Sequence, residues 1–175
     1  MSFSIYEAVH SDIDELGKLY DDLVDHLEAT NSNYPHWKKG VYPTGEFAKE
    51  YVDKGLFVLK DNGVILGSII LNNVQEDAYN DTTWGIDAHE NEVLVVRALV
   101  VCPRHIGQGI SKALLDFAKG HAKSIGAKTI RLDVTEHNFP AMRLYEKCGY
   151  TYVGTVDLGL PYENLKWFKL YELIL

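Results

Sequence analysis

The chain has 175 residues, 46% of them hydrophobic and 24% charged, a balance typical of one globular domain, and we expect residues 1–175 to form a single domain. Its net charge of -8 argues against nucleic-acid binding, which depends on lysine and arginine, and it lacks the ~20-residue apolar stretch of a membrane helix. Cys102 and Cys148 form neither a metal-ligand nor a disulfide pattern, so we expect a cytoplasmic protein with free thiols and without a metal, nucleic-acid or membrane partner.

The first part of the chain predicts a strand, two helices and a hairpin. Residues 3–9 suggest a strand, and Ser11 is the predicted N-cap of the helix that follows. Apolar residues then recur at helical spacing: Ile13, Leu16, Leu19, Tyr20, Leu23 and Leu27. Thr44 is predicted to cap a second, short helix. The stretch 56–71 indicates two strands joined by Asp-Asn-Gly, with Gly67 as a candidate bulge.

Two loops are predicted in this part of the chain, one between the two helices and one after the hairpin. The first, residues 30–43, holds four large rings: Tyr34, His36, Trp37 and Tyr42. The second, residues 73–92, carries six acids and neither lysine nor arginine. Because it is longer than most connections, we expect it to be either functional or mobile.

A strand, a glycine turn, a helix and a second strand follow. Residues 93–101 are almost wholly apolar, as expected of a strand buried on both faces. Gly107 and Gly109 precede an amphipathic helix that stops at Gly126. Residues 129–134 alternate as the next strand, so the two strands should be parallel with a right-handed connection.

The last third of the chain predicts three more elements. A helix is expected from Asn138 to Cys148, ended by Gly149. Strands are expected at 150–156 and near 166–175.

The glycine turn is a candidate phosphate site. A helix start leaves about four unpaired N–H groups at the positive end of the helix dipole. Without Cβ atoms at Gly107 and Gly109, a phosphate could approach those donors. The alternative is that the two glycines only shape a turn. A dinucleotide fingerprint does not fit, because Lys112 stands at its third glycine position.

Residues 98–154 closely resemble the core of the GCN5-related N-acetyltransferase (GNAT) superfamily. An apolar strand, Pro103, the glycine turn, the amphipathic helix and a terminal "LYEKCGY" occur there together. The resemblance implies an α/β GNAT fold: a mixed central sheet of about six or seven strands with a splayed parallel pair, flanked by about four helices. Acetyl-CoA would bind where the pair separates.

The resemblance also implies which residues contact acetyl-CoA. Backbone groups of Leu99 and Val101 would pair with the pantetheine arm. The pyrophosphate loop would consist of Ile106, Gly107, Gln108, Gly109, Ile110 and Ser111. This register departs from the family pattern at Ile106 and Ser111. A register beginning at Arg104 matches the pattern better but would start the helix too early, so we prefer the first.

Asn138 and Tyr145 complete the implied cofactor site. They are seven residues apart and so face the same side of their helix. In the family, the asparagine holds the pantetheine arm and the tyrosine hydroxyl lies beside the cofactor sulfur. Taken without the resemblance, Asn138 would be an N-cap and Tyr145 a core aromatic residue.

The implied reaction is direct transfer of an acetyl group from acetyl-CoA to a primary amine of a small molecule or peptide. Tyr145 would be the general acid that protonates the departing thiolate, and the Val101 amide would donate to the oxyanion. Arg97 stands where many relatives carry a glutamate or histidine that acts as the general base. Arginine stays protonated and cannot take that role. We therefore assign no general base, although Glu92 could act through water.

Trp37, Tyr42 and Arg97 are the candidate acceptor-binding residues. The acceptor should enter between loops 30–43 and 73–92, where the acids favour a cationic amine. Two alternatives stay open: a non-catalytic CoA-binding or regulatory module, suggested by Arg97, and an O-acyltransferase on the same scaffold. A homodimer would be common for the family, but the sequence identifies no interface.

Overall fold

The structure is a computed structural model that describes residues 2–30, 37–162 and 165–175. The chain divides into two compact units. Of the described residues, the first unit holds 2–30, 37–71 and 97–117, and the second holds 72–96, 118–162 and 165–175. Each unit is built around its own cluster of buried apolar side chains.

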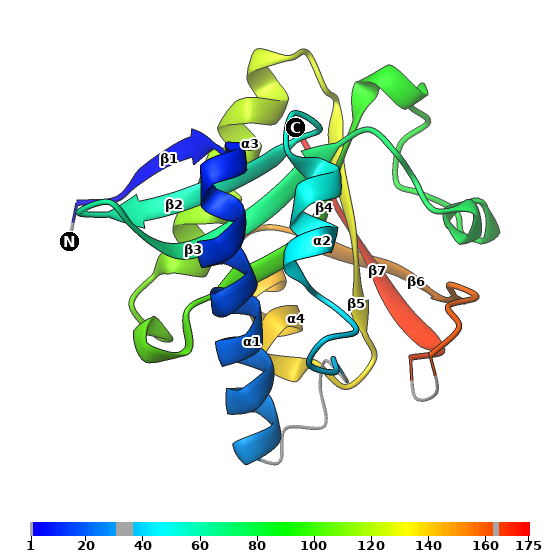
Figure 1. Ribbon diagram of the computed structural model, residues 1–175. Coiled ribbons are helices and arrows are strands. Elements are labelled where there is room, and N and C mark those ends of the chain that lie inside the picture. The colour runs from blue at the N-terminus through cyan, green and yellow to red at the C-terminus, as the bar shows by residue number, and fades with distance from the viewer. Residues whose placement is uncertain (1, 31–36, 163–164) are drawn as a thin grey trace. The chain divides into compact units, whose positions relative to one another are not determined.

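A mixed sheet of seven strands in the described residues has the order β1-β2-β3-β4-β5-β7-β6 (Figure 1). Its strands are β1 (Ser4–Glu7), β2 (Leu56–Asp61), β3 (Val64–Asn72), β4 (Val93–Val101), β5 (Thr129–Thr135), β6 (Thr151–Asp157) and β7 (Trp167–Ile174). Strands β4 and β5 are parallel, with Val93 opposite Thr129 and Val96 opposite Leu132. That register ends at Val96, whereas β4 continues to Val101. The predicted parallel pair is confirmed.

Four α-helices accompany the sheet in the described part of the chain, as predicted. They are α1 (Ile13–Ala29), α2 (Gly45–Tyr51), α3 (Ile110–Ser124) and α4 (Phe139–Lys147). The apolar face of α1 is buried in the first unit through Leu16, Leu19 and Tyr20, because these residues recur at helical spacing. Within the described ranges, none of the helices combines the length and the apolar character needed to cross a membrane.

The start of α1 differs from the prediction. The N-cap is Asp12 and not Ser11, which lies in a short 3-10 helix, His10–Asp12. The Asp12 carboxylate accepts the Val9 amide at 3.0 Å and the Lys60 ammonium at 2.7 Å. These bonds hold residues 10–12 in a tight turn, and the Lys60 contact comes from a strand distant in sequence.

The α2 cap and the hairpin follow the predictions. Thr44 Oγ1 accepts the Phe47 amide at 3.1 Å. The β2–β3 turn places Asn62 and Gly63 at φ of 49° and 82°, which these residue types tolerate. The register shifts between Leu59 and Lys60, so the bulge in β3 adjoins Gly67.

Gly67 itself lies at a close approach within the first unit. A Cβ there would be 2.9 Å from the Val100 carbonyl oxygen and 3.0 Å from Ile110 Cγ2. The glycine therefore lets β3 pack tightly against β4 and the start of α3.

Strand β5 organises the second unit and has one polar face. Its apolar side chains, Ile130, Leu132 and Val134, alternate with Thr129, Arg131, Asp133 and Thr135. Helix α4 covers the apolar side, where Tyr145 contacts Tyr171, the β7 partner of Leu132. On the polar side, the 3-10 helix η2 (Asp77–Asp81) packs Tyr79 against Val95 and Leu170. The 73–92 loop thus lies over the polar face of the strand.

Candidate active site

The end of β4 carries the two residues assigned to the pantetheine arm. Leu99 and Val101 are half-buried, and Leu99 directly follows Ala98, whose φ is +45°. A positive φ is uncommon for alanine and interrupts the regular strand conformation at that point. The Cys102 amide donates to the Leu66 carbonyl at 2.8 Å and so ties the end of β4 to β3.

The glycine turn leads into α3 at the predicted position. Gly107 and Gly109 have φ of +83° and +82°, so the turn conformation alone accounts for both glycines. A Cβ at either position would meet no atom within 4 Å. The Ala113 amide donates to the Gly109 carbonyl at 2.9 Å, and the amides of Ile110 and Ser111 precede this bond at the helix start. The two glycines therefore allow the backbone to turn, and they also leave the amides at the start of α3 accessible.

The side chains of the turn divide between solvent and core. Ile106 is 57% exposed and Gln108 is exposed, whereas Ile110 is 1% exposed and contacts the Gly67 position. Ser111 is half-buried. Because α3 begins at Ile110, the helix start agrees with the register counted from Ile106.

Asn138 and Tyr145 lie on α4 in the second unit. Asn138 is the N-cap, and its Oδ1 accepts the Ala141 amide at 3.2 Å. Tyr145 is buried, with its ring centroid 5.9 Å from that of Tyr150 and 6.1 Å from that of Tyr171. Burial raises the pKa of the Tyr145 phenol well above its ordinary value, and the negative charge of Asp133 raises it further. The phenol is therefore protonated at neutral pH.

The aromatic residues assigned to the acceptor form part of a row in the first unit. Ring centroids are 5.7 Å apart for Trp37 and Tyr42, 4.8 Å for Tyr42 and Phe47, and 5.0 Å for Phe47 and Tyr51. Three of the four, Trp37, Phe47 and Tyr51, pack against the core of that unit. Packing thus accounts for the row. The predicted Tyr34 and His36 lie outside the described residues.

Arg97 lies on β4, immediately before Ala98. Its side chain is half-buried and its Nε is fully buried. Glu92, the other residue considered for proton transfer, forms an ion pair with Lys128 at 2.6 Å, and this pair lowers the Glu92 pKa. Glu92 is thereby a stabilised anion at the surface.

Sequence reasoning missed a buried polar pair in the second unit. The Tyr79 hydroxyl donates to the Asp133 carboxylate at 2.6 Å, and Tyr79 is 1% exposed. The available signal was Asp133, a charged residue within the alternating strand 129–134. A charged side chain in a central strand needs a hydrogen-bonding partner from elsewhere in the fold. Its partner lies 54 positions away in sequence.

In the described part of the chain, the His, Cys, Asp and Glu side chains form no group of three or more that could hold a metal ion. Cys102 is buried and Cys148 is half-buried.

The sequence model of the acetyltransferase (GNAT) family matches residues 18–150. The chain belongs to this family. A streptothricin acetyltransferase from Escherichia coli is 37% identical over 78 residues, which cover 45% of this chain and 41% of the relative. The uncharacterized N-acetyltransferase MJ1207 from Methanocaldococcus jannaschii is 28% identical over 137 residues, which cover 74% of this chain and 57% of the relative. The chain thus spans about half the length of these two GNAT relatives.

Solved GNAT structures share the fold over nearly the whole chain. An acetyltransferase of the family from Streptococcus agalactiae 2603 has a TM-score of 0.78 at 18% identity and covers 99% of this chain and 95% of its own. The putative acetyltransferase yncA from Salmonella typhimurium, solved with its cofactor acetyl-CoA, has a TM-score of 0.69 at 17% identity and covers 99% and 94%. The GNAT fold predicted from residues 98–154 is confirmed.

Proposed function

We propose that this chain is an acetyl-CoA-dependent N-acetyltransferase that transfers the acetyl group directly to a primary amine of a small molecule or peptide. The observation that carries the proposal is the buried, protonated Tyr145 on α4, within the stretch that the family model matches. The names of the two curated relatives, both acetyltransferases, support it. In this proposal residues 1–175 act as one catalytic domain that holds no metal.

Acetyl-CoA would supply the acetyl group as an activated thioester. Its pyrophosphate would accept hydrogen bonds from the amides of the turn 106–111, where the glycines leave open space. The backbone groups of Leu99 and Val101 would hold the pantetheine arm, together with Asn138. The Asn138 cap bond uses the side-chain oxygen, so the side-chain NH₂ group remains the donor for this contact.

Tyr145 would protonate the thiolate that leaves when the acetyl group departs. In water a phenol with a pKa of about 10 is a weaker acid than a thiol of about 8.5, which makes the transfer uphill by roughly 2 kcal/mol. Burial raises the pKa of Tyr145 above this value. The same loss of solvent would raise the pKa of the thiol, so burial affects donor and acceptor in the same direction.

Trp37, Tyr42 and Arg97 would contact the acceptor in this proposal. The six acids of residues 73–92 favour an acceptor that is cationic before it loses its proton. No residue is assigned as the general base.

The test is release of the coenzyme A thiol from acetyl-CoA in the presence of a panel of amines. The panel includes streptothricin, because one relative is named a streptothricin acetyltransferase. It also includes small primary amines and peptides. We expect turnover with at least one amine and a fall in kcat of at least roughly 100-fold for Tyr145→Phe, the lower range for a lost general acid. Calorimetry should give the same acetyl-CoA affinity for both proteins.

A second candidate function is a non-catalytic CoA-binding or regulatory module. Arg97 favours it, because many relatives have a general base at this position. It predicts acetyl-CoA binding without turnover of any amine. An O-acyltransferase would instead be recognised by acetylated alcohols among the products. Silence across the whole amine panel would therefore count against the proposed function.

A further inference from the structure

A buried ion pair lies on the polar face of β5. Arg131 and Glu172 face each other in the β5–β7 register, with Arg131 Nε 3.0 Å from Glu172 Oε2. The two residues are 4% and 3% exposed. Charged side chains are rarely buried so completely, and when they are, each remaining hydrogen-bonding atom needs a partner.

The Arg131 guanidinium finds its other partners in the 73–92 loop. Nη1 donates to the Gln75 side-chain oxygen at 2.9 Å, and Nη2 donates to the Ile86 carbonyl at 3.0 Å. The guanidinium carbon lies 4.3 Å from the centre of the Trp84 ring, a cation–π contact. One side chain of β5 thus binds both ends of the segment 75–86.

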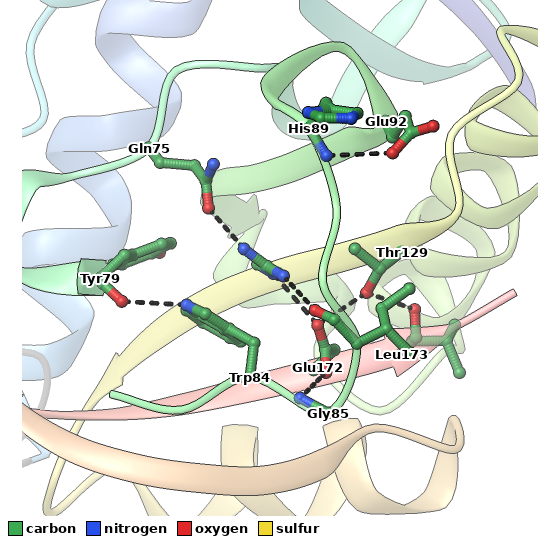
Figure 2. A network of polar contacts seen from close by, with 11 residues as sticks. Gln75, Tyr79, Trp84, Gly85, His89, Glu92, Thr129, Glu172 and Leu173 are labelled. Carbon is green, nitrogen blue, oxygen red and sulfur yellow. Dashed lines mark hydrogen bonds and ion pairs between the residues drawn. The ribbon is translucent and has the colours of Figure 1, made fainter. Parts of the chain in front are cut away.

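The Glu172 carboxylate binds the same segment from β7. Its Oε1 accepts the Gly85 amide at 2.7 Å, and its Oε2 accepts the Thr129 hydroxyl at 3.0 Å (Figure 2). A Cβ at Gly85 would come within 2.7 Å of Glu172 Oε1, so this position requires glycine for the contact to form. Both members of the ion pair therefore bind backbone groups of an irregular loop.

The fastened segment carries Tyr79. The Trp84 Nε1 donates to the Tyr79 carbonyl at 2.9 Å, and the two rings are 5.2 Å apart (Figure 2). The Tyr79 hydroxyl then reaches back to Asp133, two residues beyond Arg131 on the same face of β5. The negative charge of Asp133 also raises the pKa of Tyr145, which packs on the opposite, apolar side of β5. The ion pair, the fastened segment and the Tyr79–Asp133 hydrogen bond thus form one set of contacts on the polar face of β5.

We propose that Arg131 and Glu172 are positioning residues for acetyl transfer: by fastening residues 75–86 across β5, they hold the Tyr79 hydroxyl on the Asp133 carboxylate. This inference rests on the proposed function. A pair that served stability alone would be an inefficient choice, because apolar residues of similar volume are often as stabilising as a buried ion pair. The directed hydrogen bonds to Gln75, Gly85 and Ile86 are what apolar residues could not replace.

The main experiment uses the double variant Arg131→Met with Glu172→Met. Removing both charges avoids the uncompensated buried ion that would threaten folding in either single variant. We expect a folded protein in which hydrogen–deuterium exchange of residues 75–86 is at least roughly 10-fold faster, since its fastening bonds are gone. With acetyl-CoA and the preferred amine, kcat should fall roughly 10- to 100-fold while the KM for acetyl-CoA stays unchanged.

Two further variants keep the proposal open to refutation if the double variant fails to fold. Gly85→Ala retains both charges but displaces the segment from Glu172, and it should give the same combination of faster exchange and lower kcat. Tyr79→Phe removes only the hydroxyl that binds Asp133, so it should lower kcat without faster exchange. Combined with Gly85→Ala, its effect should be less than additive, because both changes break one set of contacts.

Lys128→Met is the matched control. It breaks the ion pair to Glu92 at the far end of the same loop, where Lys128 is exposed, and should change neither exchange of 75–86 nor kcat. Unchanged kcat in variants whose 75–86 segment exchanges faster would overturn the proposal and leave the proposed function intact. A wild-type protein inactive with every amine would overturn the proposed function, while the exchange data would still decide whether the ion pair fastens the loop.

Discussion

Asn138 Oδ1 accepts the Ala141 amide at 3.2 Å, and this bond begins helix α4. The cap reading and the cofactor reading of Asn138 are therefore compatible, because the cap occupies the oxygen and leaves the NH₂ group as a donor. Two substitutions separate the two roles.

Asn138→Ser should preserve the cap and lose the cofactor contact. Serine caps helices about as well as asparagine, whereas Asn138→Ala should cost about 1 kcal/mol of unfolding free energy. We expect urea unfolding to distinguish only the alanine variant from wild type, and calorimetry to show weaker acetyl-CoA binding in both. Wild-type affinity in Asn138→Ser would restrict this residue to its structural role.

Gly109→Ala tests whether the turn amides bind pyrophosphate. Its control is Gly40→Ala, since both glycines have positive φ, +82° and +74°, and open space around the Cβ position. Each substitution should cost about 1–2 kcal/mol of unfolding free energy through left-handed backbone strain. Only Gly109→Ala should also weaken acetyl-CoA binding in calorimetry. Equal affinities in the two variants would argue that the turn does not contact the cofactor.

Gly67→Ala should destabilise the first unit. The new methyl group would press on the Val100 carbonyl at 2.9 Å, and overpacking of this kind costs about 1–3 kcal/mol. Gly120→Ala is the control, because it lies in α3 with open space around it and should stabilise by roughly 0.5–1 kcal/mol. Urea unfolding measures both changes. A Gly67 variant as stable as wild type would contradict the close approach of β3 and β4.

The raised pKa of Tyr145 predicts a loss of stability at alkaline pH. Above about pH 10 the unfolded chain releases the phenol proton, while the folded protein keeps it because burial disfavours the phenolate. This contribution is complete below pH 10 and declines as the pH rises further. The urea midpoint of wild type should thus fall more steeply above pH 10 than that of Tyr145→Phe. Identical alkaline slopes in wild type and Tyr145→Phe would show that the buried phenol contributes nothing to the pH dependence.

Much of the fold could be predicted because its signals are local. The strand 93–101 has the predicted bounds, since an almost wholly apolar run between Glu92 and Pro103 leaves little choice. Helix α3 starts and stops where glycines permit it. The Ser11 prediction was wrong because the Lys60 contact that fixes the neighbouring Asp12 comes from a strand 48 residues further on.

The residues of the candidate site were likewise predicted where their signals are local and missed where they depend on distant contacts. Asn138 and Tyr145 were found through the resemblance of one continuous segment, and their roles stay predictions. The contacts of Tyr79 and Trp84 were missed because they join the 73–92 loop to strands more than 40 residues away. Composition alone described that loop by its acids, whereas its buried aromatic and amide groups determine how it is held.

The fastening of residues 75–86 shifts an entropic cost from ligand capture to folding. A loop that closed on its acceptor would lose its freedom of motion during each binding event, and affinity would be reduced accordingly. This segment has lost that freedom before any acceptor arrives. In the proposed function, this fastened segment would discriminate between acceptors by shape, and the preference between two amines that differ by a methylene should be modest, roughly 10- to 200-fold.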